Sequence, residues 1–329
     1  MQIILSESNY ATEMEQIVEP YLAAHGTERY VEREEGRKLY VVMYRAERPK
    51  GLVMVSHGFT ENAEKYKEYL YYFVKMQYHV CMVEHCGHGR SYRLTEDPSL
   101  VHVDSWERYV EDFLYVTHLA QKAAQPGLPL YLYGHSMGGG IAAAAAAKEP
   151  DLFAKVILSS PMIRPSTGDV PWKTAQQIAS HFCRTGRAMR YVIGQHPYEG
   201  GGSFEESCAT SRARFDYYRK KERVNQRFQL SAPSYGWLAA AGGMNQYLQH
   251  RGWKEIKAPV LLFQAEKELL VSKREQERFI RKIYRRGIAP QAALIRVPGS
   301  KHEIFNTSGH ILEQYWRHVF HFLAENDRK

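Results

Sequence analysis

The pentapeptide GHSMG at residues 134–138 sets a serine hydroxyl between two glycines in a G-x-S-x-G pattern. Residues 130–133 are apolar and aromatic, as in a buried strand, and the alanine-rich run after the motif favours a helix. In that setting the turn is strained, and residues 134 and 138 approach each other so closely that a side chain on either would clash. The pattern therefore predicts that Ser136 is a nucleophile, whereas a chance match in a glycine-rich loop would lack the strand and the helix.

A serine hydroxyl is a weak nucleophile at neutral pH, so it requires a base for its proton and a carboxylate to orient that base. In sheets that carry this motif, the chain order is serine, acid, histidine. His302 lies just beyond the apolar run 293–298, in a Pro-Gly-Ser-Lys loop, and is the predicted base. The predicted acid is Glu268, which follows the strand-like run 260–265 and precedes an apolar segment. Glu266 is the alternative acid, and a third interpretation makes both glutamates solvated loop charges.

Acyl transfer also needs N–H donors aimed at the developing oxyanion, and the loss of one donor costs on the order of 100- to 1000-fold in rate. The amide of Met137, at the start of the predicted helix, is one candidate donor. The second candidate is the amide of Phe59, because Gly58 would let the backbone turn towards the site. We interpret His57 as a structural hydrogen-bonding residue rather than as a catalyst.

The elements that must bring these residues together alternate between apolar strands and amphipathic helices. Strand patterns occur at 51–58, 79–91, 130–133 and 154–161, and helical patterns occur at 63–76 and from Asp104, a candidate cap, to about residue 125. Residues 1–28 are predicted to be a helical lead-in, residues 30–49 a hairpin about Glu35-Gly36, and strands and helices alternate again after residue 258. The pattern predicts the α/β class, with a mostly parallel, doubly wound sheet and helices on both faces. Ligands bind such sheets at the carboxyl ends of the strands, where Ser136 falls.

The alternation stops between residues 162 and 252, which we interpret as a mainly helical cap, or lid, inserted into a core of residues 1–161 and 253–329. Its aromatic side chains would line an acyl tunnel, and its arginines would bind a phosphate bidentately. The other interpretation is a set of amphipathic helices whose aromatic side chains pack inward and whose arginines are solvated. The residues concerned are Trp172, Phe182, Arg184, Arg187, Arg190, Tyr191, Phe204, Arg212, Arg214, Phe215, Tyr217, Tyr218, Arg219, Arg227, Phe228, Tyr235 and Trp237.

Composition narrows the class of protein further. The 329 residues are enough for one large domain with an insertion, and the net charge of +8 permits attraction to an anionic membrane surface. No nucleic-acid recognition motif accompanies the basic residues, and no apolar run reaches the roughly 18 residues of a membrane span. Because the first residues lack the basic start and cleavage site of a signal peptide, we expect a cytoplasmic protein with at most peripheral membrane contact. The four cysteines lack a zinc-like spacing and are interpreted as reduced thiols, and no metal or cofactor is expected.

Four motifs together resemble the α/β-hydrolases of the monoacylglycerol lipase and bacterial lysophospholipase group: HGF at 57–59, EHCGHGRS at 84–91, GHSMGG at 134–139 and GSKHE at 299–303. The resemblance runs from about residue 30 to residue 322 and is weak through the insertion. It implies hydrolysis of a single acyl ester on glycerol or on a lysophospholipid, with the insertion acting as a lid. The sequence departs from the group at the acid, which is usually an aspartate. The stretch QAEKE at 264–268 aligns Glu268 with that aspartate. Because the glutamate side chain is one methylene longer, the loop that carries Glu268 must lie farther from the histidine.

We therefore expect a serine hydrolase that cleaves a small-molecule carboxylic ester, monoacylglycerol or lysophospholipid, through an acyl-enzyme on Ser136. One alternative is a carboxylesterase for aromatic or xenobiotic esters of the feruloyl type, with the cap aromatics stacking on the substrate. A second alternative is a non-catalytic binding protein with a hydrolase fold. Such a protein would be expected to lose part of the triad, whereas all three members can be placed here.

Overall fold

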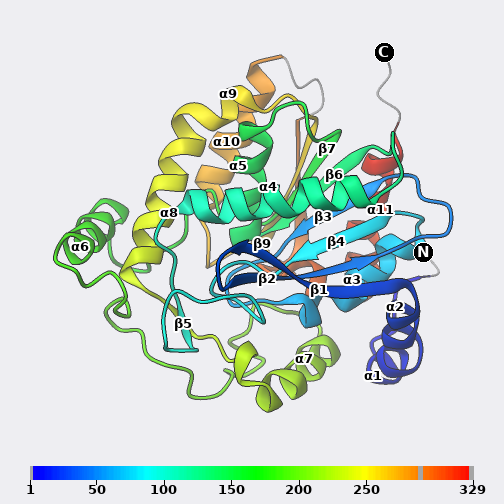
Figure 1. The fold of residues 1–329 in the computed structure, drawn as a ribbon, viewed down its shortest axis with the longest axis horizontal. Coiled ribbons are helices and arrows are strands. Elements are labelled where there is room, and N and C mark those ends of the chain that lie inside the picture. The colour runs from blue at the N-terminus through cyan, green and yellow to red at the C-terminus, as the bar shows by residue number, and fades with distance from the viewer. Residues whose placement is uncertain (1–2, 288–291, 326–329) are drawn as a thin grey trace.

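The structure, a computed structural model, describes residues 3–287 and 292–325. Of the predicted core, residues 1–2, 288–291 and 326–329 lie outside the described part. Within the described residues the central sheet has the strand order β1-β2-β4-β3-β6-β7-β9-β10 (Figure 1). These strands are β1 (Gly26–Glu34), β2 (Arg37–Tyr44), β3 (Leu52–Ser56), β4 (His79–Val83), β6 (Leu130–His135), β7 (Lys155–Ser159), β9 (Val260–Lys267) and β10 (Ala293–Lys301).

The sheet is parallel from β4 to β10, and β2 is the strand of this sheet that runs opposite to them. β1 pairs with β2 and β2 pairs with β4 in antiparallel fashion, whereas each remaining neighbouring pair is parallel. The turn of the hairpin falls at Glu35-Gly36, as predicted, and Gly36 has a positive φ of 73°. The predicted mostly parallel, doubly wound α/β sheet is thus confirmed.

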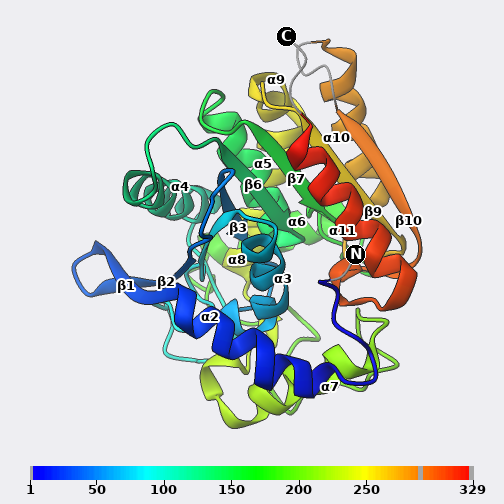
Figure 2. The same ribbon diagram turned by 90° about the vertical axis from the view of Figure 1, so that its right-hand side faces the viewer.

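Helices cover both faces of the sheet because alternate strand residues point to opposite sides. In β3, Leu52 and Met54 pack into one apolar cluster, whereas Val53 and Val55 pack into the other. The first cluster is completed by α4 (Trp106–Ala123), α5 (Met137–Lys148) and α10 (Lys273–Arg285), and the second by α3 (Ala63–Lys75) and α11 (Gly309–Ala324) (Figure 2). No helix in the described ranges has both the length and the apolar character needed to cross a bilayer.

Helix α4 begins one residue later than the sequence indicates. The predicted cap, Asp104, instead binds the side chain of Arg108, and Ser105 is the N-cap, its hydroxyl accepting a hydrogen bond from the amide of Arg108. The two residues compete for this role because either side chain can accept from the first helical turn, and only the backbone conformation decides between them.

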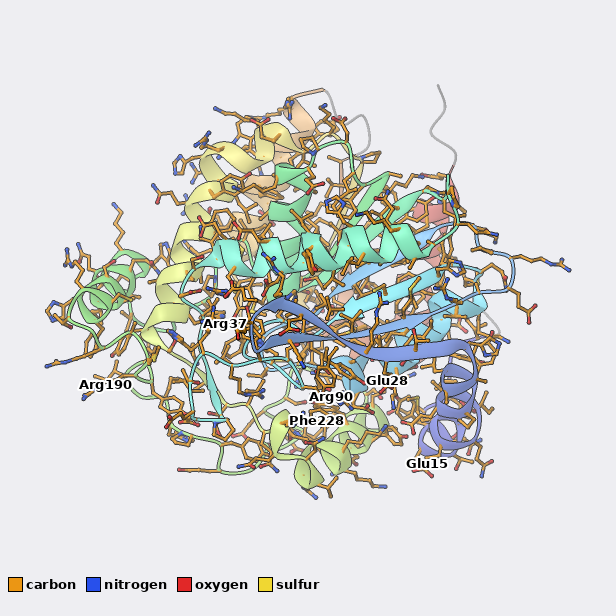
Figure 3. The ribbon with its side chains drawn as sticks, viewed as in Figure 1. Glu15, Glu28, Arg37, Arg90, Arg190 and Phe228 are labelled. Carbon is orange, nitrogen blue, oxygen red and sulfur yellow. The ribbon has the colours of Figure 1, made fainter. Side chains whose placement is uncertain are left out.

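Residues 162–252 contain α6 (Trp172–Arg184), α7 (Arg212–Val224) and α8 (Tyr235–Tyr247), which lie outside the sheet (Figure 1). The short strand β8 (Ala232–Pro233) pairs with β5 (Leu100–Val101), and the short helix α9 (Trp253–Glu255) leads back to β9. Arg90 also joins this segment to the sheet, because its guanidinium lies 4.6 Å from the ring of Tyr40 and 4.9 Å from the ring of Phe228 (Figure 3).

The lead-in before the sheet is helical, as predicted. It consists of α1 (Tyr10–Glu13), the π-helical turn Met14–Val18 and α2 (Glu19–His25). Its buried side chains, Met14, Val18 and Leu22, belong to the apolar cluster that contains α3. Figure 2 shows this segment running alongside α7, although the two are separated by almost 200 residues in the sequence.

Candidate active site

Ser136 occupies the sharp turn between β6 and α5, and its backbone is strained, with φ 53° and ψ −121°. A Cβ atom on Gly134 would lie 2.5 Å from the carbonyl oxygen of Gly138, which is the close approach that the motif predicts. A Cβ atom on Gly138 would overlap the carbonyl oxygens of Ser56 and His57 at the end of β3. Both glycines are therefore required by backbone packing, which no side-chain adjustment can relieve.

Ser136, His302 and Glu268 form one chain of hydrogen bonds. The Ser136 Oγ lies 2.8 Å from Nε2 of His302, and Nδ1 of His302 lies 2.7 Å from Oε2 of Glu268. His302 follows the end of β10 and Glu268 follows the end of β9, so all three lie at the carboxyl ends of parallel strands. Ser136 and His302 are both buried, and both line the same cavity.

The carboxylate of Glu268 is held from both sides. Its Oε1 accepts hydrogen bonds from the amides of Leu270 (2.9 Å) and Val271 (3.2 Å). Burial alone would raise the pKa of Glu268, but the hydrogen bond and charge of His302, with the two amides, lower the pKa below its usual value. The group is therefore ionised at neutral pH and can stabilise a protonated imidazole.

Glu266, the alternative acid, points elsewhere. Its side chain is exposed, and Oε2 accepts a hydrogen bond from the amide of Gly299 at 2.8 Å. Because Glu266 still belongs to β9 and Glu268 is the first residue after it, the two side chains leave the chain in different directions. The structure brings Glu268, and not Glu266, to His302.

One candidate oxyanion donor is adjacent to the nucleophile in the chain, and the other borders the same cavity. Met137 is the first residue of α5, directly after Ser136, and Phe59 lines the same cavity as Ser136. The neighbouring amide of Gly58 is already engaged with Oε2 of Glu61 at 2.6 Å. Gly58 does not have a positive φ, and a Cβ there would lie 2.6 Å from the Glu61 carboxylate, so close approach of Glu61 favours glycine at this position.

His57 is fully buried and has both ring nitrogens in hydrogen bonds. Nδ1 donates to the carbonyl of Gly58 (2.8 Å), and Nε2 accepts from the amide of His85 (2.9 Å). Burial lowers the pKa of His57 to about 4, so the ring is neutral at pH 7. These contacts agree with the structural role that the sequence indicates for this residue.

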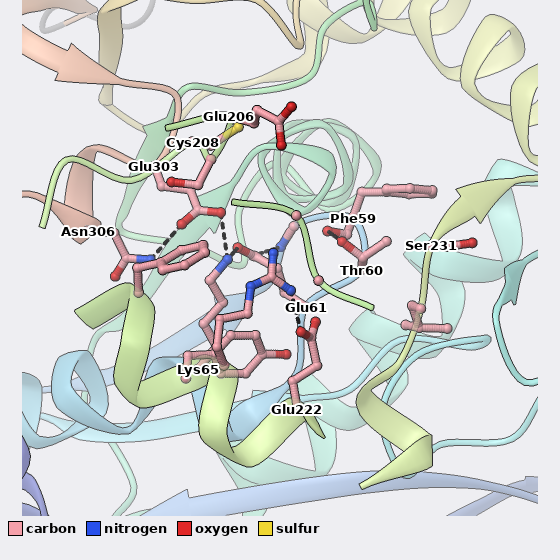
Figure 4. A pocket seen from close by; sticks show the side chains of 18 of the residues that line it. Phe59, Thr60, Glu61, Lys65, Glu206, Cys208, Glu222, Ser231, Glu303 and Asn306 are labelled. Carbon is pink, nitrogen blue, oxygen red and sulfur yellow. Dashed lines mark hydrogen bonds and ion pairs between the residues drawn. The ribbon is translucent and has the colours of Figure 1, made fainter. Parts of the chain in front are cut away.

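A cavity of about 380 Å³ opens above Ser136 between the sheet and residues 196–231 (Figure 4). Core residues form one wall, and α7 with the loop before it forms the other. The α7 residues that line it are Arg214, Phe215, Tyr218, Arg219 and Glu222, and the loop contributes residues 196–202 and 206–208.

The inner end of the cavity holds a polar cluster that sequence reasoning missed. Nζ of Lys65 lies 3.0 Å from Oε1 of Glu61 and 2.6 Å from Oε1 of Glu303, and Asn306 donates to Oε2 of Glu303 (Figure 4). Burial alone would lower the pKa of Lys65, but Glu303 and Glu61 raise it, so the ammonium group stays charged. The sequence feature that could have indicated this cluster is the position of Glu303, directly after the predicted base His302.

The other cations that line the cavity in the described chain are also paired. Arg219 binds Glu222 on the same helix. Arg214 is buried with Glu68 (2.6 Å) and also contacts Glu7 (3.0 Å). Arg214 is thus neither solvated nor free to bind a phosphate, which corrects both interpretations that the sequence allows for it.

The family model described as serine aminopeptidase, S33, matches residues 47–308, which include the strands β3 to β10 and all three residues of the hydrogen-bonded chain. The chain belongs to this family. Proteins named for lipid hydrolysis are among its relatives. A probable lysophospholipase L2 of Haemophilus influenzae is 26% identical over 83% of both chains. A monoglyceride lipase of Homo sapiens is 39% identical over 35% of this chain and 36% of its own.

The fold also occurs in a solved structure of a monoglyceride lipase. A soluble variant of monoglyceride lipase from Saccharomyces cerevisiae superposes with a TM-score of 0.70 at 19% identity, covering 91% of this chain and 95% of its own. This S33 family protein therefore has the α/β-hydrolase fold, and relatives of the group that its motifs resemble are among the proteins similar to it.

Proposed function

We propose that the protein hydrolyses esters of a single acyl chain, monoacylglycerol or lysophospholipid, with Ser136, His302 and Glu268 as catalytic triad. The observation that carries the proposal is the continuous hydrogen-bonded path from the Ser136 hydroxyl through His302 to Glu268, with distances of 2.8 and 2.7 Å. The names of the relatives, lysophospholipase L2 and monoglyceride lipase, support this substrate class.

The mechanism follows from that path. Ser136 Oγ attacks the ester carbonyl while its proton passes to Nε2 of His302, and Glu268 stabilises the resulting imidazolium. The amides of Phe59 and Met137 donate to the oxyanion of the tetrahedral intermediate. The intermediate collapses when His302 protonates the leaving alcohol, which leaves an acyl group on Ser136. Water then attacks the acyl-enzyme with His302 as the base, and the fatty acid is released.

We assign the two domains with the boundaries that the sequence predicts. Residues 1–161 and 253–329 are the hydrolase core, and residues 162–252 are a lid that covers the acyl-binding cavity. The aromatic residues Phe215 and Tyr218 of α7 support this assignment because they line the cavity above Ser136. The net charge of +8 supports peripheral contact with an anionic membrane surface at the cytoplasmic side.

Replacement of Ser136 tests the proposal directly. The Ser136→Ala variant is expected to lose roughly 10⁴-fold or more of kcat on a p-nitrophenyl acyl ester, because no other group can form the acyl-enzyme. A fluorophosphonate probe should label the wild-type protein and not the variant. Wild-type turnover by the variant would rule out the assignment of Ser136 to a catalytic triad. A folded wild-type protein that the probe does not label would favour the alternative of a non-catalytic binding protein.

A series of acyl esters then tests the substrate class. Hydrolysis of decanoyl glycerol and of decanoyl lysophospholipids should exceed hydrolysis of acetyl and feruloyl esters in kcat/KM. The reverse order would support the carboxylesterase for aromatic esters instead.

A further inference from the structure

Helix α7 presents two neighbouring rows of side chains. Arg214, Tyr217 and Lys221 follow an i, i+3, i+7 spacing, which places them along one side of the helix. Phe215, Tyr218, Arg219 and Glu222 occupy the adjoining side and line the cavity above Ser136. Arg214 lies where the two rows meet, and it borders the cavity as well.

The first row is bound by the N-terminal segment, residues 3–25. Glu7 caps the start of α7: Oε1 accepts from the amide of Ala213 (3.0 Å), and Oε2 accepts from Ser211 Oγ (2.7 Å) and Arg214 Nη1 (3.0 Å). The Arg214 guanidinium also lies 4.6 Å from the ring of Tyr10 and donates to the carbonyl of Leu5.

The contact continues along the helix for two more turns. The rings of Tyr10 and Tyr217 meet edge to face at 5.6 Å, and the Tyr217 hydroxyl donates to Oε1 of Glu19 at 3.0 Å. Lys221 forms ion pairs with the same Glu19 and with Glu64 of α3. The N-terminal segment thus contacts the helix from its N-cap to its last turn.

The core holds only the start of α7 directly by backbone contacts. The amides of Thr210 and Ser211 donate to the carbonyl of Asn306, in the loop that follows His302. Beyond that point the helix contacts side chains of α3 and of the N-terminal segment, together with Asn62, Tyr198 and Gln229. The family model begins at residue 47, so the N-terminal segment lies before the part of the chain that defines the family.

We propose that the N-terminal segment is a positioning element of the substrate site, which fixes α7 and thereby sets the cavity wall formed by Phe215, Tyr218 and Glu222. Glu7 and Glu19 are its two positioning residues, one at each end of the helix. The effect on turnover rests on the proposed function, whereas the effect on α7 itself does not.

The test compares Glu7→Ala with Glu15→Ala, which removes the same charge from an exposed position of the same segment (Figure 3). In E7A, KM for monodecanoyl glycerol should rise about fivefold, the equivalent of one lost hydrogen bond, while fluorophosphonate labelling of Ser136 and kcat for p-nitrophenyl acetate stay at wild-type values. Amide hydrogen exchange should quicken in residues 212–224 of E7A, and E15A should match the wild type in every measurement. Glu7→Gln keeps an acceptor for the Ala213 amide and should restore part of the difference.

The outcomes separate the two proposals. If E7A leaves both the exchange of α7 and the KM unchanged, the positioning role is wrong while wild-type turnover still supports the hydrolase. If the wild-type protein hydrolyses none of the esters, the exchange data alone decide the positioning role. Should E7A fail to fold, Glu19→Gln tests the other end of the helix by the same readouts, with the same result expected.

Discussion

At the scale of single residues, Glu268 acts by orienting the ring of His302. The carboxylate binds Nδ1 of His302 with one oxygen and two backbone amides with the other, and its side chain is 0% exposed. This arrangement fixes the ring orientation that leaves Nε2 facing Ser136. It also keeps a negative charge next to the imidazolium that forms during acyl transfer.

Glu268→Gln is therefore expected to lower kcat by about 10³-fold or more, because the amide cannot compensate the imidazolium charge and favours the wrong tautomer. Glu266→Gln is the matched control and should retain near-wild-type kcat. The exposed side chain of Glu266 accepts a hydrogen bond from the amide of Gly299 and makes no hydrogen bond with His302 in the described part of the chain. Both values come from steady-state hydrolysis of a p-nitrophenyl ester. Equal losses in the two variants, or a loss confined to Glu266→Gln, would contradict the assignment.

The choice between these two glutamates shows what could be predicted at this scale. Ser136 and His302 are marked by local patterns: a nucleophile motif after a strand, and a histidine after the last strand. The acid depended on where β9 ends and how the following loop turns, and the chain offers carboxylates on both sides of that point. In that loop the amides of Leu270 and Val271 donate to Glu268, and no local pattern encodes these hydrogen bonds.

At the scale of elements, the buried pair between α7 and α3 joins the cap segment to the core. Arg214 donates to both oxygens of Glu68, at 2.6 and 3.0 Å, and both side chains are 1% exposed. Glu68 also accepts from the hydroxyl of Tyr10, so the pair has a complete hydrogen-bonding shell on the carboxylate side. Removal of one partner leaves the other as a charge without compensation in the interior.

Arg214→Met is expected to destabilise the protein by about 3–5 kcal/mol, as is typical when one member of a buried ion pair is removed. The double variant Arg214→Met/Glu68→Gln should recover part of that loss, because no buried charge then remains unpaired. Urea unfolding followed by circular dichroism measures both values. A single variant as stable as the wild type would mean that the pair contributes nothing to docking α7.

The sequence predicts the core elements well and the cap segment poorly, for a physical reason. Strand and helix patterns are local, so the alternation of β3 to β7 and the helices α3 and α5 could be predicted closely. The contacts of Arg214 in α7 with Glu68 and with Glu7 join residues separated by 146 and 207 positions. Long-range ion pairs leave no periodic pattern in the sequence. The sequence therefore indicates only solvent or a phosphate group as the partner of the arginines in this segment.

At the scale of the whole molecule, four buried histidines couple stability to pH. His57, His85, His88 and His135 all have lowered pKa values because burial disfavours the charged ring, and those of His57 and His135 are about 4. Unfolding exposes the rings and returns each pKa to about 6.5. Below pH 6.5 the unfolded chain therefore binds more protons than the folded protein, and the stability present above that pH is lost progressively as the pH falls towards 4.

The free energy of unfolding should accordingly fall when the pH is lowered from 7.5 to 5, by up to about 1.4 kcal/mol per pH unit for each histidine, and the melting temperature should fall with it. The raised pKa values of buried Glu84 and Asp112 act in the opposite direction but are fewer. His57→Gln should flatten the profile, and exposed His321→Gln should leave its slope unchanged. A melting temperature that stays constant from pH 7.5 to 5 would contradict this account.

The pairing of every cavity cation among the described residues has a consequence for lipid selectivity. A phosphate entering this space would have to displace Glu61, Glu303 or Glu222 from its partner, whereas glycerol hydroxyls can bond to those carboxylates as they stand. In a competition between monoacylglycerol and an anionic lysophospholipid of the same chain length, the neutral lipid should be consumed first. The net charge of +8 would then favour approach to an anionic bilayer, while the internally neutralised cavity selects the neutral lipids within it.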